Sequence, residues 1–176
     1  TSSATVEIFP RASPPRRRTA AAPQVTGQAD ALAVLAHDLR GPLANLSLRM
    51  LCLDATARGD TVWPGRAYQR FKDAGSMTER QGALTALLYA HSELAEPALA
   101  RFHELFKDEP LVLDKWFALQ AMAPERGGSV FQRAKALLKH PDYSLANPNR
   151  ARSLIFSLCR ENPSAFHRSD AAGYAF

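Results

Sequence analysis

The sequence predicts an all-α fold of stacked antiparallel helical hairpins, and three observations support this prediction. From residue 30 onward, apolar residues recur at the three- and four-residue spacing of amphipathic helices. Proline and glycine divide this pattern into segments of about 10–16 residues with short connections, which is typical of antiparallel helical neighbours. No stretch shows the sustained alternation of apolar and polar residues that is typical of a strand.

Residues 1–29 differ in composition from the rest of the chain. They hold four of the twelve prolines, and four arginines against one glutamate place +3 of the net charge of +5 there. Such a segment buries too little apolar surface to offset its chain entropy. We therefore predict a disordered arm rich in Pro, Arg and Ala over residues 1–29, and a helical domain over residues 30–176. The small charge of that domain does not favour a nucleic-acid partner.

The first predicted helices lie within residues 30–75. The Gly41–Pro42 pair is expected to interrupt or restart the first one, because proline removes a backbone donor from a helix interior. Gly59 is expected to end this region, and a further helical segment should stop near Gly75. The apolar positions that carry the pattern are Val34, Leu35, Leu39, Leu43, Leu46, Leu48, Met50, Leu51, Leu53, Tyr68 and Phe71.

Capping residues mark the later helix starts. Ser76, with Glu79 three residues on, fits a capping box. Asn147 and Asn162 are each followed by proline, which is the pairing of a cap with a favourable first helical residue. Other boundaries are expected at Glu96–Pro97, Pro110, Pro124, Gly127–Gly128 and His140–Pro141. If each hairpin packs on the next, the fold is a solenoid-like superhelix of the ARM or HEAT type. Because no strict sequence repeat is present, a compact irregular bundle is the alternative.

No catalytic or metal-binding motif is complete in this sequence. A zinc-peptidase helix needs two histidines one turn apart with a glutamate beside the first. The segment from His103 to Lys107 approaches this pattern, but a lysine cation stands where the second ligand belongs. Nucleophile elbows, phosphate-binding glycine loops and dinucleotide fingerprints have no match either. We therefore expect no catalytic residue and no metal site in this chain, and its other histidines should be surface or core residues.

Two observations concern the location of the protein. No apolar run approaches the roughly 20 residues that span a bilayer. Cys52 and Cys159 each lie in an apolar helical pattern, which predicts buried free thiols of the kind found in a reducing compartment. We expect a cytoplasmic protein without a membrane partner.

The first residue is not methionine and the chain stops abruptly at Phe176, which predicts a truncated piece of a longer protein.

The segment AHDLRGPL, residues 36–43, resembles the phosphoacceptor box of sensor histidine kinases. By that resemblance His37 would accept the phosphoryl group and Asp38 would polarise it. Such kinases also carry an ATP-binding domain downstream, with an asparagine-rich box and a glycine-rich lid, and residues 60–176 contain neither. A phosphoacceptor module built on His37 is therefore kept as an alternative function, beside a helical protein-interaction scaffold.

A more specific resemblance is spread over the second half of the chain. Four segments carry it: SMTERQGAL from Ser76, LDKWFALQA from Leu113, NPNRARSLI from Asn147, and NPSAFHRSDAAGYAF from Asn162. In order and spacing they resemble the C-terminal helical domain of bacterial aminopeptidase N, in the M1 zinc metallopeptidase family. The resemblance is best over residues 65–176. Ala171 departs from it, because the family usually has glycine at that position.

This resemblance implies a non-catalytic helical domain that encloses the active site of a zinc aminopeptidase and limits peptide access. The parent enzyme would remove N-terminal residues from peptides by metal-assisted hydrolysis, with its zinc in an N-terminal catalytic domain of the same polypeptide. The expected partners are that catalytic domain and the peptide substrates, and no cofactor is expected in this chain. The family also has further helices after this region, so an apolar patch should be exposed here.

The same resemblance suggests which residues face the substrate channel. The candidates are Asn149, Arg150 and Arg152, because an arginine can pair with the carboxylate end of a peptide in a fork geometry. The alternative is structural: the asparagines would be cap and turn residues, and the arginines would pair with acidic residues of a neighbouring helix. Asp114 is itself expected to be a cap or an intramolecular ion-pair partner.

Overall fold

The computed structural model describes residues 28–176, with side chains described from Leu39 onward. Nearly all of the predicted arm, residues 1–27, lies outside the described residues, and residues 28 and 29 are already helical. Over the described range the chain is helical without strands, which confirms the all-α class. The elements are α1 (Gln28–Ala57), α2 (Val62–Asp73), α3 (Met77–Tyr89), α4 (Ala95–Phe106), α5 (Pro110–Ala121), α6 (Ser129–Leu137), α7 (Pro148–Ala151), the π-helix η1 (Arg152–Glu161), α8 (Pro163–Phe166) and the 3-10 helix η2 (Ala172–Ala175).

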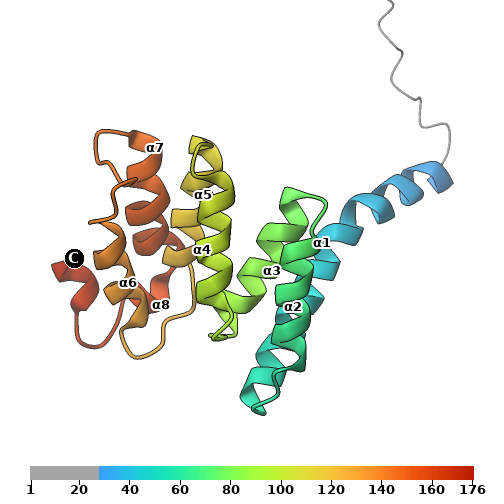
Figure 1. The fold of residues 1–176 in the computed structure, drawn as a ribbon, viewed down its shortest axis with the longest axis horizontal. Helices are drawn as coiled ribbons and strands as arrows, with labels where there is room; N and C mark the ends of the chain where they lie inside the picture. The colour runs from blue at the N-terminus through green and yellow to red at the C-terminus, as the bar shows by residue number, and fades with distance from the viewer. Residues whose placement is uncertain (1–27) are drawn as a thin grey trace, which may run out of the picture.

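The helices follow one another across the molecule in chain order (Figure 1). The helices α1, α2 and α3 pack together at one end, and α3 contacts α4. Next along the stack, α5 packs between α4 and the later elements α6 and η1. The main contacts join elements that are close in chain order, such as α1 with α3 and α5 with η1, which is a solenoid-like arrangement. The structure therefore confirms the predicted stacking of helices.

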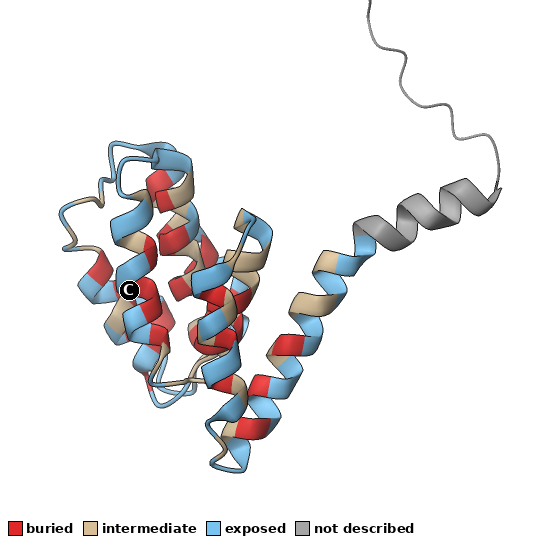
Figure 2. Ribbon diagram, turned by 45° about the vertical axis from the view of Figure 1, so that its right-hand side comes forward, coloured by how far each residue is buried: buried red, intermediate tan, exposed pale blue. Residues whose placement is uncertain are grey.

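One hydrophobic core connects these helices. Figure 2 shows buried residues on the inner faces of the helices and exposed residues on the outer faces. Phe71 of α2 and Phe102 of α4 are fully buried, with ring centroids 6.5 Å apart, and Phe102 contacts Phe106 at 4.9 Å. Both cysteines are free: Cys52 is buried as predicted, whereas Cys159 is only half-buried. Burial raises the pKa of the Cys52 thiol to about 11.

The predicted helix starts are confirmed by their capping bonds. The Ser76 hydroxyl accepts the Glu79 N–H at 3.2 Å. The Asn147 side chain accepts the Asn149 and Arg150 N–H groups at 3.0 and 3.3 Å, and the Asn162 side chain accepts the Ala165 N–H at 3.3 Å. These bonds satisfy backbone donors that have no partner within the helix.

The prediction that Gly41–Pro42 interrupts the first helix is wrong, because α1 runs through both residues without a break. Proline costs the helix one backbone hydrogen bond, but Pro42 is exposed, so its ring does not displace a neighbouring helix. Packing against α3 holds the following residues: the Asn45 side chain donates to the Thr78 carbonyl at 3.1 Å. A side chain at Gly82 would overlap the Asn45 amide, so α1 and α3 approach closely there.

Ala171 lies in the left-handed region of the backbone, at the position where the resemblance led us to expect glycine. Its φ is +56°, a left-handed conformation that costs an L-residue about 1–2 kcal/mol. We predict that Ala171→Gly raises the free energy of unfolding by up to about 1 kcal/mol, after the larger chain entropy of glycine is subtracted. Urea denaturation followed by circular dichroism measures this change. The control is Ala172→Gly, one residue further into η2, and equal effects of the two variants would contradict the prediction.

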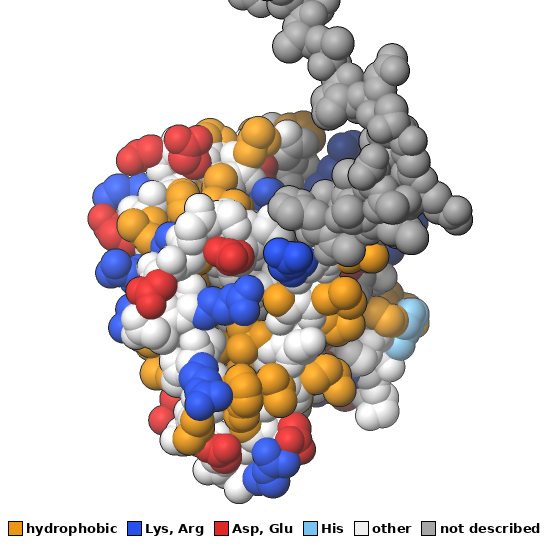
Figure 3. All heavy atoms as spheres, turned by 90° about the vertical axis from the view of Figure 1, so that its right-hand side faces the viewer, with side chains coloured by type: hydrophobic (Ala, Val, Ile, Leu, Met, Phe, Trp, Pro, Cys, Tyr) orange, Lys and Arg blue, Asp and Glu red, His pale blue; other side chains and the backbone are white. Residues whose placement is uncertain are grey.

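The largest group of exposed apolar side chains lies on α1, at the other end of the stack from the C-terminal face where the apolar patch was expected. Leu43, Leu46 and Met50 are 57%, 53% and 61% exposed, and Figure 3 shows hydrophobic side chains gathered at this end of the molecule. Phe156 of η1 is also 45% exposed. Although α1 is long, none of the described helices combines the length and hydrophobicity that crossing a membrane requires.

Candidate functional site

Trp116 of α5, from the LDKWFALQA segment, brings three parts of the chain together. Its indole N–H donates to the Leu99 carbonyl of α4 at 3.0 Å, and the side chain is buried. The rings of His103, Phe117 and His140 surround it, with centroids 5.0, 5.0 and 5.3 Å away. The helix α4 and the loop after α6 therefore meet against one aromatic side chain.

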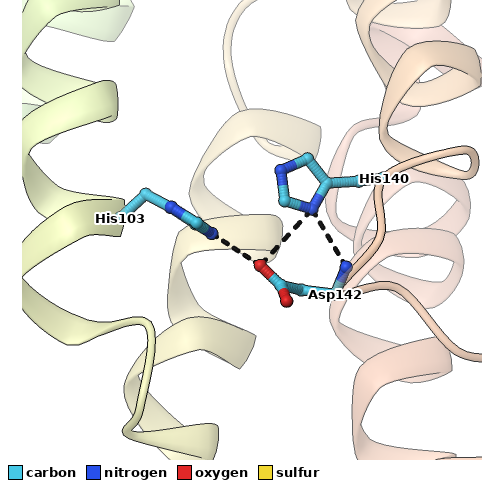
Figure 4. A group of neighbouring side chains, drawn as sticks. All are labelled: His103, His140 and Asp142. Carbon is cyan, nitrogen blue, oxygen red and sulfur yellow. Dashed lines mark hydrogen bonds and ion pairs between the residues drawn. The ribbon is translucent and has the colours of Figure 1, made fainter.

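Beside Trp116, two histidines and one carboxylate converge (Figure 4). His103 comes from α4, whereas His140 and Asp142 come from the loop after α6. The Nε2 atom of His103 lies 2.7 Å from Oδ2 of Asp142, and Nδ1 of His140 lies 3.6 Å from the same oxygen. One possible ligand atom from each residue lies within 4.8 Å of the other two. This is a half-buried group with the chemistry of a metal-binding site.

Hydrogen bonds fix the loop that carries His140 and Asp142. The Asp142 backbone N–H donates to Nδ1 of His140 at 3.2 Å, and the Tyr143 N–H donates to the His140 carbonyl at 2.9 Å. A guanidinium N–H of Arg150 donates to the Asp142 carbonyl. Burial lowers the pKa of His140, and the nearby Asp142 carboxylate opposes that shift. The neutral His140 ring that accepts the amide bond carries its proton on Nε2.

Sequence spacing did not predict this group of side chains. His103 and Asp142 are 39 residues apart, which is outside every short motif for metal ligands. We had expected these histidines to be isolated surface or core residues. They meet because α5 lies between α4 and α6 and presents Trp116 to both. The signal in the sequence is limited to the His140–Pro141–Asp142 run, which places two possible ligands two residues apart.

Of the three channel candidates, Arg150 is used inside the fold. Its side chain is 7% exposed and its Nε–H donates to a carboxylate oxygen of Asp114 on α5. Its other N–H groups donate to the Asp142 carbonyl and, at 3.4 Å, to the Pro110 carbonyl. The guanidinium also lies 5.1 Å from the Phe117 ring centroid. The structure therefore shows the ion pair with a neighbouring helix that the structural alternative described.

Asn149 and Arg152 are both exposed, on the turn into the π-helix η1. Asn149 follows the Asn147 cap, and Arg152 is the first residue of η1. Arg152 also borders a shallow apolar hollow with Ile155 and Phe156. Neither side chain is paired with an acidic group among the ion pairs of residues 39–176. The two therefore stay available to a ligand, on a surface that Arg150 does not share.

His37, the acceptor in the kinase-like alternative, lies in α1, but its side chain is outside the described residues. The AHDLRGPL segment occupies the middle of one long helix.

Comparison with known proteins gives consistent relatives. A family described as a domain of unknown function (DUF3458_C) with ARM repeats matches residues 28–176, which includes the AHDLRGPL segment. Aminopeptidase N of Escherichia coli strain K12 is 35% identical over 135 residues, and aminopeptidase N of Caulobacter vibrioides is 38% identical over 131 residues. These matches cover 76% and 74% of this chain but only 15% of each relative.

A solved structure shows the same fold. The crystal structure of Legionella pneumophila aminopeptidase A in complex with aspartic acid matches with a TM-score of 0.60 and 33% identity. The match covers 64% of this chain and 13% of that one. This chain thus corresponds to a small part of each protein to which it is similar.

Proposed function

Since this chain belongs to the DUF3458_C family of ARM-repeat domains, and its relatives are aminopeptidases N, we propose that it is a helical domain that encloses the active site of a zinc aminopeptidase. One observation carries the proposal: the family match extends over every described residue, 28–176. In this proposal the parent enzyme removes N-terminal residues from peptides, and the stack of helices limits which peptides enter. The small share of each relative that the chain covers is consistent with a domain of a larger polypeptide.

The catalytic chemistry of the parent belongs to another part of that polypeptide. The helix from His103 to Lys107 does not fit a catalytic zinc, because Lys107 donates to the Glu104 carboxylate at 3.1 Å, and that carboxylate would have to act as the general base. A catalytic zinc held in an N-terminal M1-type domain would activate the attacking water and polarise the peptide carbonyl. The contribution of this chain is a surface for the substrate. We also propose a cytoplasmic location, which the two free cysteines support.

Within this surface, Arg152 is the residue that we propose to contact peptides, with Asn149 beside it. The Arg152 guanidinium is exposed and borders an apolar hollow, so it can reach a carboxylate without first breaking an ion pair within the described fold. A guanidinium binds a carboxylate through two parallel N–H donors. The free C-terminus of a short peptide is the carboxylate that every such substrate carries.

We predict that Arg152→Ala, made in the longer protein that contains this domain, raises KM for short peptides with a free C-terminus by about tenfold or more. The KM for a single-residue chromogenic amide should stay unchanged, because that substrate has no distant carboxylate. A peptide series with free and amidated C-termini measures the difference. Arg160→Ala is the matched control, because Arg160 is exposed on the same π-helix. A uniform change in both substrate classes, or equal effects of the two variants, would remove Arg152 from the channel.

A further inference from the structure

We propose that His103, His140 and Asp142 form a binding site for a divalent transition-metal ion such as zinc, which clips α4 to the loop after α6. The site stands on side chains of this chain alone. This inference does not depend on the proposed function.

The three ligands have the chemistry and the spacing that zinc requires. Imidazole nitrogens and a carboxylate oxygen are the donors that zinc and similar ions bind. With metal–ligand bonds of about 2.0–2.1 Å, the ligand atoms of a tetrahedral site lie roughly 3.3 Å apart. The observed separations from Oδ2 of Asp142 are 2.7 Å to His103 and 3.6 Å to His140. All three atoms lie within 4.8 Å, so small side-chain rotations bring them to one ion.

The surrounding fold holds the ligands in place before any ion binds. His103 packs on Trp116, and His140 packs on Trp116 and Phe117 at 5.3 and 5.8 Å. The loop between the two ligands is fixed at both ends by bonds to the His140 and Asp142 carbonyl groups. Ligands that are locked by packing and by hydrogen bonds lose little entropy when they bind a metal. The partial exposure of all three side chains leaves room for water as the fourth ligand.

The ion pair between His103 and Asp142 does not include His140, whose ring is held by Trp116, Phe117 and the Asp142 N–H. Nδ1 of His140 is 3.6 Å from the shared carboxylate oxygen, which is too long for a hydrogen bond. Its lone pair accepts the 3.2 Å bond from the Asp142 N–H, and a metal ion bound to Nδ1 would replace that bond. The nearest guanidinium, that of Arg150, is paired with Asp114 and therefore opposes a cation only weakly. On binding, the ion would replace the hydrogen bond between Nε2 of His103 and Asp142, because an imidazole nitrogen that binds a metal carries no proton.

The test is a titration of the 176-residue chain, stripped of metal with a chelator, with ZnCl2 in a calorimeter. We expect one ion to bind per chain, and the melting temperature to rise with the ZnCl2 concentration. CoCl2 should give the visible absorption of a four-coordinate site. The variants are His103→Phe and His140→Phe, which keep the rings against Trp116, and Asp142→Asn, which keeps the side-chain shape. Each should weaken binding by tenfold or more.

His167→Phe is the matched control, because His167 is bonded to Tyr174 and lies outside the cluster. It should bind zinc as the unchanged chain does, and circular dichroism checks that each protein is folded. Failure of the folded, unchanged chain to bind zinc would overturn the proposal. Undiminished binding by the variants would also overturn it, because the ion would then be held elsewhere. Since the three ligands come from two separate elements, one unfolded variant still leaves two that decide.

Discussion

Replacing Arg150 with alanine is expected to lower the free energy of unfolding by about 3–5 kcal/mol, the cost of leaving one buried charge without its partner. The side chains of Arg150 and Asp114 are only 7% and 15% exposed. Arg150 also donates to the Asp142 and Pro110 carbonyl groups, so its loss leaves acceptors unsatisfied on two elements. The loop that carries His140 and Asp142 would lose its tie to α5.

Urea denaturation followed by far-ultraviolet circular dichroism measures this effect. Arg152→Ala is the control, because Arg152 is exposed two residues further on and should change stability by less than about 0.5 kcal/mol. The double variant Arg150→Met with Asp114→Leu should be more stable than Arg150→Ala alone, because no unpaired charge remains buried. Equal costs for Arg150→Ala and Arg152→Ala would show that the buried ion pair does not stabilise this fold.

Trp116→Ala is expected to cost about 3–5 kcal/mol, as for other large aromatic side chains removed from a core. Trp116 is 6% exposed and contacts His103, Phe117 and His140, so its loss leaves a cavity where three elements meet. Trp116→Phe keeps most of the packing but removes the indole donor to the Leu99 carbonyl, and it should cost about 1–3 kcal/mol.

Thermal and urea unfolding of both variants, followed by circular dichroism, gives these values. The matched control is Trp63→Ala in α2, because Trp63 is only partly buried and packs at the edge of the core. Its cost should be clearly smaller. A loss as large as that of Trp116→Ala would mean that size alone, and not the junction of elements at Trp116, sets the effect.

Helix starts were predictable from the sequence because their causes are local. Ser76, Asn147 and Asn162 satisfy backbone donors two or three residues away, so their roles can be recognised in a short stretch of residues. The continuity of α1 through Pro42 was not predictable in this way, because it depends on contacts with α3. The π-helical geometry of η1 after the confirmed Asn147 start was not predicted either.

The candidate site shows the same limit. Arg150 and Arg152 are two residues apart in one motif, so the sequence pattern made both of them candidates for the substrate channel. The structure separates them, because only Arg150 faces α5 and finds Asp114 there. His103 and Asp142 meet through packing across 39 positions, which no local pattern encodes. The resemblance to aminopeptidase N, by contrast, was readable because its four segments keep their order along the chain.

The most direct test of the proposed function is the hydrolysis of short peptides by the longer polypeptide in which this chain would lie beside its catalytic domain. We expect release of N-terminal residues that is abolished by a zinc chelator, restored by added zinc, and absent for peptides with an acetylated N-terminus. Failure of the folded, zinc-loaded protein to cleave any peptide with a free N-terminus would contradict the assignment of this chain to a zinc aminopeptidase.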